Sequence, residues 1–102
     1  MKYEKSLFAK DVIEFLKNHK QEFLDKYGIK KIALFGSVAR GENKENSDID
    51  VAIETNSVDY IKLYDFKEEL ETFFNRKVDI VRVRDKMNNS LKKRIENEAI
   101  YV

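Results

Sequence analysis

The sequence contains no cysteine and only one histidine, His19. Without cysteine the chain has neither disulfides nor thiolate ligands for a metal, and a single histidine disfavours a histidine-rich zinc site. Any metal site must therefore be built from oxygen ligands, which suit magnesium, manganese or calcium.

Proline is also absent, and glycine occurs only at positions 28, 36 and 41. No flexible linker, low-complexity tract or internal repeat is visible. A chain of 102 residues, of which 42% are hydrophobic, is long enough for one domain with one core. We therefore expect a single domain over residues 1–102.

Long apolar runs and an excess of charge of one sign are both missing. No segment approaches the roughly 18 apolar residues of a membrane span, and the N-terminus lacks a long apolar leader. Charged residues make up 38% of the chain, yet the formal net charge is only +1, which argues against a general affinity for nucleic acid. These features predict a cytoplasmic protein that binds no membrane and does not bind nucleic acid directly.

The hydrophobic pattern predicts alternating helices and strands. In chain order the expected elements are a helix at 11–27, a strand at 30–35, a short helix or turn at 37–41, a strand at 48–54, a helix at 58–74, a strand at 77–83 and a helix at 89–98. Asn56 or Ser57 could cap the helix at 58–74, and the apolar tail at 99–102 could dock as an edge strand. We expect an α/β fold, with helices packed on a small mixed sheet.

A glycine–serine pair follows the first predicted strand. A strand that ends in Gly36-Ser37 and turns into a helix exposes backbone N–H groups that favour a phosphate. Gly36 allows close approach of the backbone to the phosphate, and Ser37 can add a hydroxyl hydrogen bond. By itself such a pair is more often an ordinary turn, so the neighbouring residues must carry the argument.

After Ser37 and a gap of ten residues, two aspartates open the second predicted strand. Asp48 and Asp50 share one face of that strand, with Cα atoms roughly 6.5–7 Å apart. Aspartate is uncommon in strands, and Asp79 lies inside the third apolar run. Three neighbouring carboxylates would repel one another unless a divalent cation neutralised them. Structural salt bridges are the ordinary alternative.

Together these residues predict metal-assisted phosphoryl or nucleotidyl transfer. Two divalent ions about 3.5–4 Å apart can clamp the attacking and leaving oxygens of an in-line displacement. Asp48 and Asp50 would hold both ions. Asp79 would bind the ion beside the acceptor hydroxyl and help to deprotonate that hydroxyl.

The same residues carry a resemblance to a known family. Gly36-Ser37, a ten-residue gap, Asp48-x-Asp50 and a later strand aspartate, Asp79, resemble the nucleotidyltransferase superfamily typified by DNA polymerase β. The segment Leu34-Phe35-Gly36-Ser37-Val38-Ala39-Arg40-Gly41 and the short chain are similar to the stand-alone minimal nucleotidyltransferases (MNT). This resemblance extends from about residue 11 through the Glu98-Ala99-Ile100-Tyr101 tail, and the motif spacing is specific.

The resemblance implies a polymerase β-like fold and transfer of AMP from ATP to a hydroxyl, with two Mg²⁺ ions, or Mn²⁺, as cofactors. By matched position it assigns the triphosphate to Gly36 and Ser37, and the metal to Asp48, Asp50 and Asp79. Arg40 also matches and could contact phosphate, although a solvated helix charge explains it equally well.

The resemblance also implies a partner protein. Many MNT proteins are antitoxins of a HEPN-family ribonuclease toxin, and some silence the toxin by adenylylating one of its tyrosines. This short chain has no second domain for an acceptor, so a partner is expected to complete that side. Two alternatives stay open: a non-catalytic module that neutralises its partner by contact, with nucleotide tuning its affinity, and an adenylyltransferase of a small hydroxylated molecule.

Other residues suggest further roles. His19 lies on the apolar stripe of the first helix, where a structural role is expected. Tyr60, Ile61 and Tyr64 widen the apolar stripe of their helix beyond one face, which fits either a partner surface or packing of the N-terminal segment. A solvated face is expected for the basic residues Arg82, Arg84, Lys86, Lys92, Lys93 and Arg94.

Overall fold

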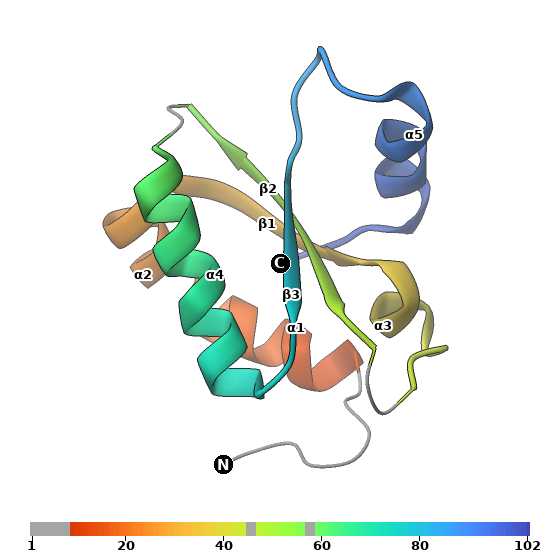
Figure 1. Cartoon of the computed structure of the whole chain (residues 1–102), viewed down its shortest axis with the longest axis horizontal. Coiled ribbons are helices and arrows are strands. Elements are labelled where there is room, and N and C mark those ends of the chain that lie inside the picture. The colour runs from red at the N-terminus through yellow and green to blue at the C-terminus, as the bar shows by residue number, and fades with distance from the viewer. Residues whose placement is uncertain (1–8, 45–46, 57–58) are drawn as a thin grey trace.

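A computed structural model of the chain describes residues 9–44, 47–56 and 59–102 (Figure 1). Its elements are α1 (Ala9–Asn18), α2 (Lys20–Tyr27), β1 (Ile29–Phe35), α3 (Gly36–Arg40), β2 (Ile49–Thr55), α4 (Tyr60–Phe74), β3 (Val78–Arg82), α5 (Asn89–Glu98) and β4 (Ile100–Tyr101). In these parts of the chain, no helix has the length and apolar content needed to cross a membrane.

The strands form one four-stranded sheet in the order β3-β2-β1-β4. β1 runs antiparallel to both β2 and β4, whereas β2 and β3 are parallel and α4 provides the crossover between them. The predicted α/β fold with a small mixed sheet is confirmed. The apolar tail forms the expected edge strand, since Tyr101 pairs with Ala33.

Helices α1, α2 and α4 cover one face of the sheet, and α5 lies on the opposite side (Figure 1). On the first face, Phe23, Phe66 and Phe74 are fully buried and form the main core with Ile32 and Leu34 of β1. The second face has a smaller core, formed by Ala33, Phe35, Ala52 and Ile95. Successive side chains of a strand point to opposite faces, so β1 is buried on both faces.

The first helix differs from its prediction because it is divided at His19. α1 ends at Asn18, α2 begins at Lys20, and His19 lies between them with φ −107° and ψ 8°. Its Nδ1 is 2.8 Å from the carbonyl oxygen of Phe15, and the two rings stack with centroids 4.2 Å apart. The half-buried ring therefore contacts the preceding turn, which agrees with the structural role expected for it.

The cap of α4 also differs from its prediction. Asp59 caps this helix, because its side chain accepts hydrogen bonds from the backbone N–H groups of Ile61 and Lys62 at 3.0 and 3.2 Å. Asn56 precedes the cap and is exposed, and Ser57 lies outside the described residues. Aspartate is as good a cap as serine or asparagine, so composition alone did not distinguish them.

Candidate active site

Asp50 and Asp79 are brought together by the parallel pairing of β2 and β3. They are register partners on these neighbouring strands, whose axes in a sheet lie about 4.8 Å apart. Both belong to the face on which α5 packs, as the alternation with Ala52 and Val81 shows. Asp48, half-buried, precedes β2 by one residue. The three predicted carboxylates therefore lie along one end of the β2–β3 pair.

The Gly36 turn lies directly against Asp50. Phe35, the last residue of β1, is the register partner of Asp50 across the antiparallel pair. Gly36 is buried and has φ +81°, and a Cβ added there would lie only 2.9 Å from Cγ of Asp50 and would also collide with its Oδ2. Only glycine meets both conditions without strain. The predicted phosphate turn is therefore in contact with the predicted metal site.

Half-buried Ser37 follows as the second residue of α3. The position of α3 is determined by Val38, which is fully buried in the main core. Burial of Val38 anchors the turn, so that Gly36 and Ser37 are held beside the strand that carries Asp50.

The electrostatics of Asp50 reflect its crowded surroundings. Partial burial raises the pKa of Asp50, and the negative charges of Asp79 and Asp48 raise it further. Arg94 and Arg40 act in the opposite direction and lower that pKa. A carboxylate destabilised by burial and like charge gains from a bound cation.

The donor set suits a hard divalent cation, because every side chain in it is a carboxylate. In the described parts of the chain, no three histidine, cysteine, aspartate or glutamate side chains stand close enough together to hold a metal ion by themselves. Mg²⁺ commonly binds one or two carboxylates and takes its remaining ligands from water and substrate phosphates. The residues therefore fit a magnesium ion whose coordination is completed by a nucleotide.

Arg40 is engaged by two carboxylates. Its Nε donates to Glu42 at 2.9 Å, and its Nη1 donates to Glu98, near the end of α5, at 2.8 Å. Its charge nevertheless reaches Asp50. A phosphate contact by Arg40 stays a prediction, and it would require Arg40 to exchange these partners.

Sequence reasoning missed the position of Arg94. Its guanidinium lies over the ring of Phe35, with Cζ 5.6 Å from the centroid, and its charge acts on Asp50. In the sequence it is one of several basic residues of the last helix, and no motif marks it. Its placement follows from packing, because Ile95 is buried on the Phe35 face of the sheet.

The basic residues after Asp79 do not form one solvated face. Arg94 projects over the site face, and Lys92 lies 3.7 Å from Asp85. Arg82 and Arg84 instead line a groove beside α4. Arg84, Lys86, Lys93 and Arg94 are exposed, as expected of solvated residues, whereas Arg82 and Lys92 are half-buried.

Comparisons with known proteins give a consistent result. The chain matches the Nucleotidyltransferase domain family over residues 16–102. MJ1379 of Methanocaldococcus jannaschii, named as a candidate protein adenylyltransferase, is 41% identical over 95 residues, which are 90% of this chain and 95% of the relative. Protein adenylyltransferase MntA of Thermococcus cleftensis is 30% identical over 97 residues, which are 94% of this chain and 97% of the relative.

Solved structures share the fold. A crystal structure of a toxin–antitoxin with AMP-PNP matches with a TM-score of 0.68 at 25% identity, over 83% of this chain and 70% of that one. A complex of a tri-AMPylated Shewanella oneidensis HEPN toxin with an MNT antitoxin matches with a TM-score of 0.61 at 21% identity, over 86% of this chain and 69% of that one. At this identity the match supports the fold alone. Because the family match spans most of the chain and the relatives are matched over nearly their whole length, this protein belongs to the nucleotidyltransferase domain family and is one of its enzymes.

Proposed function

We propose that the protein transfers AMP from magnesium-bound ATP to a tyrosine hydroxyl of a HEPN-family ribonuclease toxin, and that it is the cytoplasmic antitoxin of that toxin. The observation that carries the proposal is the contact between the Gly36 turn and Asp50, with Asp79 as its strand neighbour. Because of this contact, the backbone N–H groups that can bind a phosphate lie directly beside carboxylate oxygens that can bind a cation.

The names of relatives support the type of reaction. MntA of Thermococcus cleftensis is named a protein adenylyltransferase, and the structure with AMP-PNP is that of a toxin–antitoxin. The HEPN class of the partner comes from the sequence resemblance to the MNT family, and the MNT antitoxin in complex with a HEPN toxin has a similar fold.

On the donor side, Gly36 admits a phosphate oxygen because it carries no side chain, and Ser37 would donate its hydroxyl hydrogen to another. Asp48, Asp50 and Asp79 would hold magnesium, which when bound neutralises the triphosphate and acidifies the acceptor hydroxyl. The acceptor oxygen attacks the α-phosphorus, the bond from that phosphorus to the β-phosphate oxygen breaks, and pyrophosphate leaves.

On the acceptor side, Asp79 would accept the hydroxyl proton. It lies on the edge strand β3, whereas Gly36 follows β1 and Asp50 lies on β2 between them. The donor and acceptor therefore approach from opposite ends of this row. β3 is an edge strand of the sheet, so an acceptor carried by another molecule can approach Asp79 from beyond that edge.

The experiment that tests this proposal is co-expression with a HEPN-family partner, followed by intact mass measurement of that partner. Wild type should add one or more AMP units to a tyrosine. Asp50→Asn should add none, whereas Asp65→Asn, which changes an exposed aspartate of α4, should behave as wild type.

Cell growth separates catalysis from contact. If Asp50→Asn protected cells from the toxin as well as wild type does, neutralisation by contact alone would suffice and the enzymatic proposal would be wrong. Transfer of AMP to a small hydroxylated acceptor without any partner would instead support the small-molecule alternative.

A further inference from the structure

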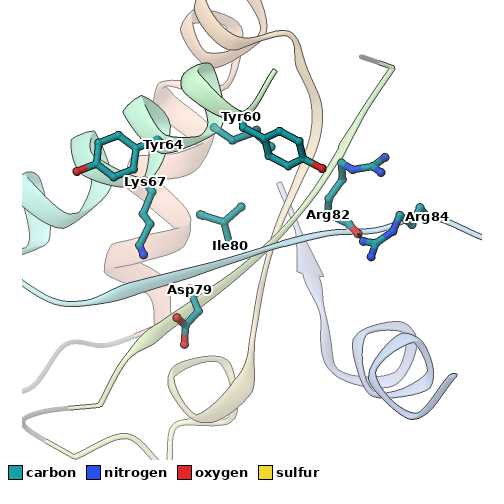
Figure 2. Close-up of a pocket in the computed structure, with 8 residues that line it drawn as sticks. Tyr60, Tyr64, Lys67, Asp79, Ile80, Arg82 and Arg84 are labelled. Carbon is teal, nitrogen blue, oxygen red and sulfur yellow. Dashed lines mark hydrogen bonds between the residues drawn. The ribbon is translucent and has the colours of Figure 1, made fainter. Parts of the chain in front are cut away.

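A groove runs between α4 and the edge strand β3, next to the site described above, and Asp79 of that site is among the residues that line it (Figure 2). It holds about 480 Å³. α4 contributes Tyr60, Tyr64 and Lys67 to its wall, and β3 with the residues after it contributes Ile80, Arg82 and Arg84.

The helix side of the groove is unusually apolar for a surface. Tyr60 is 78% exposed and Tyr64 is 60% exposed, and Ile61 beside them is 76% exposed. α4 packs on the core through its other face, where Phe66 and Leu70 are fully buried. The exposed face is therefore not needed for the fold, and contiguous exposed apolar residues of this kind mark interaction surfaces.

The charge of the groove is basic. Among the described residues, Lys67, Arg82 and Arg84 form no ion pair with a carboxylate. The guanidinium of Arg84 donates instead to the backbone carbonyl of Arg82 at 2.8 Å. Three cations outnumber the single carboxylate of Asp79 that also lines the groove, so the groove favours an acidic ligand.

The backbone of β3 offers a short open edge. The N–H of Val83 bonds to Ile53 of β2 at 2.8 Å, so by alternation Val78, Ile80 and Arg82 present their backbone groups outward. The two ends of this edge are closed, because the Val78 N–H donates to Glu71 at 2.9 Å and the Arg82 carbonyl accepts from Arg84. Between them, Ile80 presents an N–H and a carbonyl that an added strand could pair with.

The geometry of strand addition would connect this groove to the active site. Side chains of an added strand alternate between the two faces of the sheet. One set would enter the groove beside Tyr60 and Tyr64. The other set would lie level with Asp79, which Figure 2 shows on the opposite side of β3 from the two tyrosines.

We propose that this groove binds an extended, acidic segment of the acceptor protein as an added strand on β3, with its hydroxyl-bearing residue facing Asp79. The identity of that residue as an AMP acceptor rests on the proposed function, whereas the docking itself does not. Acidic side chains of the segment would pair with Lys67, Arg82 and Arg84, and apolar side chains would contact Tyr60 and Tyr64.

A displayed library of nine-residue peptides, each with a central tyrosine and random flanks, tests the docking without nucleotide or magnesium. We expect wild type to select acidic sequences with apolar residues on each side of the tyrosine. A selected peptide should shift the amide NMR signals of Ile80 and Arg82 and slow the hydrogen exchange of Ile80. Arg82→Glu and Lys67→Glu should each weaken its binding at least tenfold, whereas Lys17→Glu, the same charge change on exposed α1 surface, should not.

The possible results separate the two proposals. The docking proposal would be overturned if no peptides were selected, if the selected sequences were basic, or if the NMR shifts mapped elsewhere. It would also be overturned by self-association through β3 or by displacement of the peptide by a single-stranded oligonucleotide. Peptide binding in the groove without AMP transfer after addition of magnesium and ATP would leave the docking proposal standing and contradict the proposed function. AMP transfer to the partner that is unaffected by Arg82→Glu would contradict the docking proposal and leave the proposed function standing.

Discussion

The two faces of the sheet differ in what their side chains do. The face beneath α1, α2 and α4 is filled by large apolar residues, among them the fully buried Phe23, Phe66 and Phe74. The face beneath α5 has a smaller core that includes the small side chains of Ala33 and Ala52. The carboxylates and Arg94 lie on this face. Charges near a thick apolar core would be costly to desolvate. The large core therefore lies on one face of the sheet and the candidate active site on the other.

The largest expected effect tests the stability of the first face. Phe66→Ala should lower the free energy of unfolding by about 3–5 kcal/mol, because it removes a fully buried ring and leaves a cavity. Urea unfolding monitored by circular dichroism measures the change. Tyr60→Ala, an aromatic truncation on the exposed side of the same region, should stay within about 0.5 kcal/mol of wild type. Equal losses in the two variants would contradict the assignment of the stability to the buried side of α4.

The next prediction concerns the turn that enters the second face. Gly36→Ala should cost roughly 1–3 kcal/mol, because it combines strain at positive φ with a collision against Asp50. Gly41→Ala is a matched control, since Gly41 has φ +73° but open space around it. Saturating ATP at 100 times its Kd stabilises a binding-competent fold by about 2.7 kcal/mol. Thermal melting with Mg²⁺ and ATP should show this gain for Gly41→Ala and not for Gly36→Ala; gains of equal size in both would argue against a phosphate site at Gly36.

The third prediction is a gain in stability with a loss of activity. The folded-state pKa of Asp50 is raised, so the folded protein favours the protonated carboxyl over the ionised one. The stability that the protonated form contributes is present at low pH and is lost as the pH rises through the folded pKa. Asp50→Asn should therefore melt at a higher temperature than wild type at pH 7 without metal, while it abolishes AMP transfer. The difference should vanish below pH 3.8, the ordinary pKa of aspartate. A lower melting temperature at neutral pH would show that Asp50 is structurally stabilising.

The smallest effect on stability is expected for Arg94→Gln. The exposed guanidinium contributes no more than about 0.5 kcal/mol to folding, but its charge lowers the pKa of Asp50. The substitution should raise that pKa, measured by NMR titration of the Asp50 carboxyl carbon. Lys93→Gln, the neighbouring exposed position, should leave the titration unchanged. An unchanged pKa in Arg94→Gln would remove Arg94 from the electrostatics of the site.

Local sequence signals predicted those features that depend on neighbours along the chain. Short apolar runs located β1, β2 and β3, and the Gly36-Ser37 to Asp48-x-Asp50 spacing indicated the family. The division at His19 and the cap at Asp59 lay within the reach of such signals but were missed, because a helical stripe tolerates one non-helical residue and several capping residues are nearly equivalent.

The sequence by itself determined which chemical groups are present and how far apart they stand along the chain: an oxygen-only set of possible metal ligands and a glycine–serine pair separated from the first of them by ten residues. Only the tertiary structure decided which of these groups meet. The β2–β3 register sets Asp79 beside Asp50, α5 lays Arg94 over Phe35, and the sheet order leaves β3 as an open edge beside α4. These contacts join residues distant in sequence, and they arise from strand pairing and the burial of apolar faces, which a linear spacing does not encode.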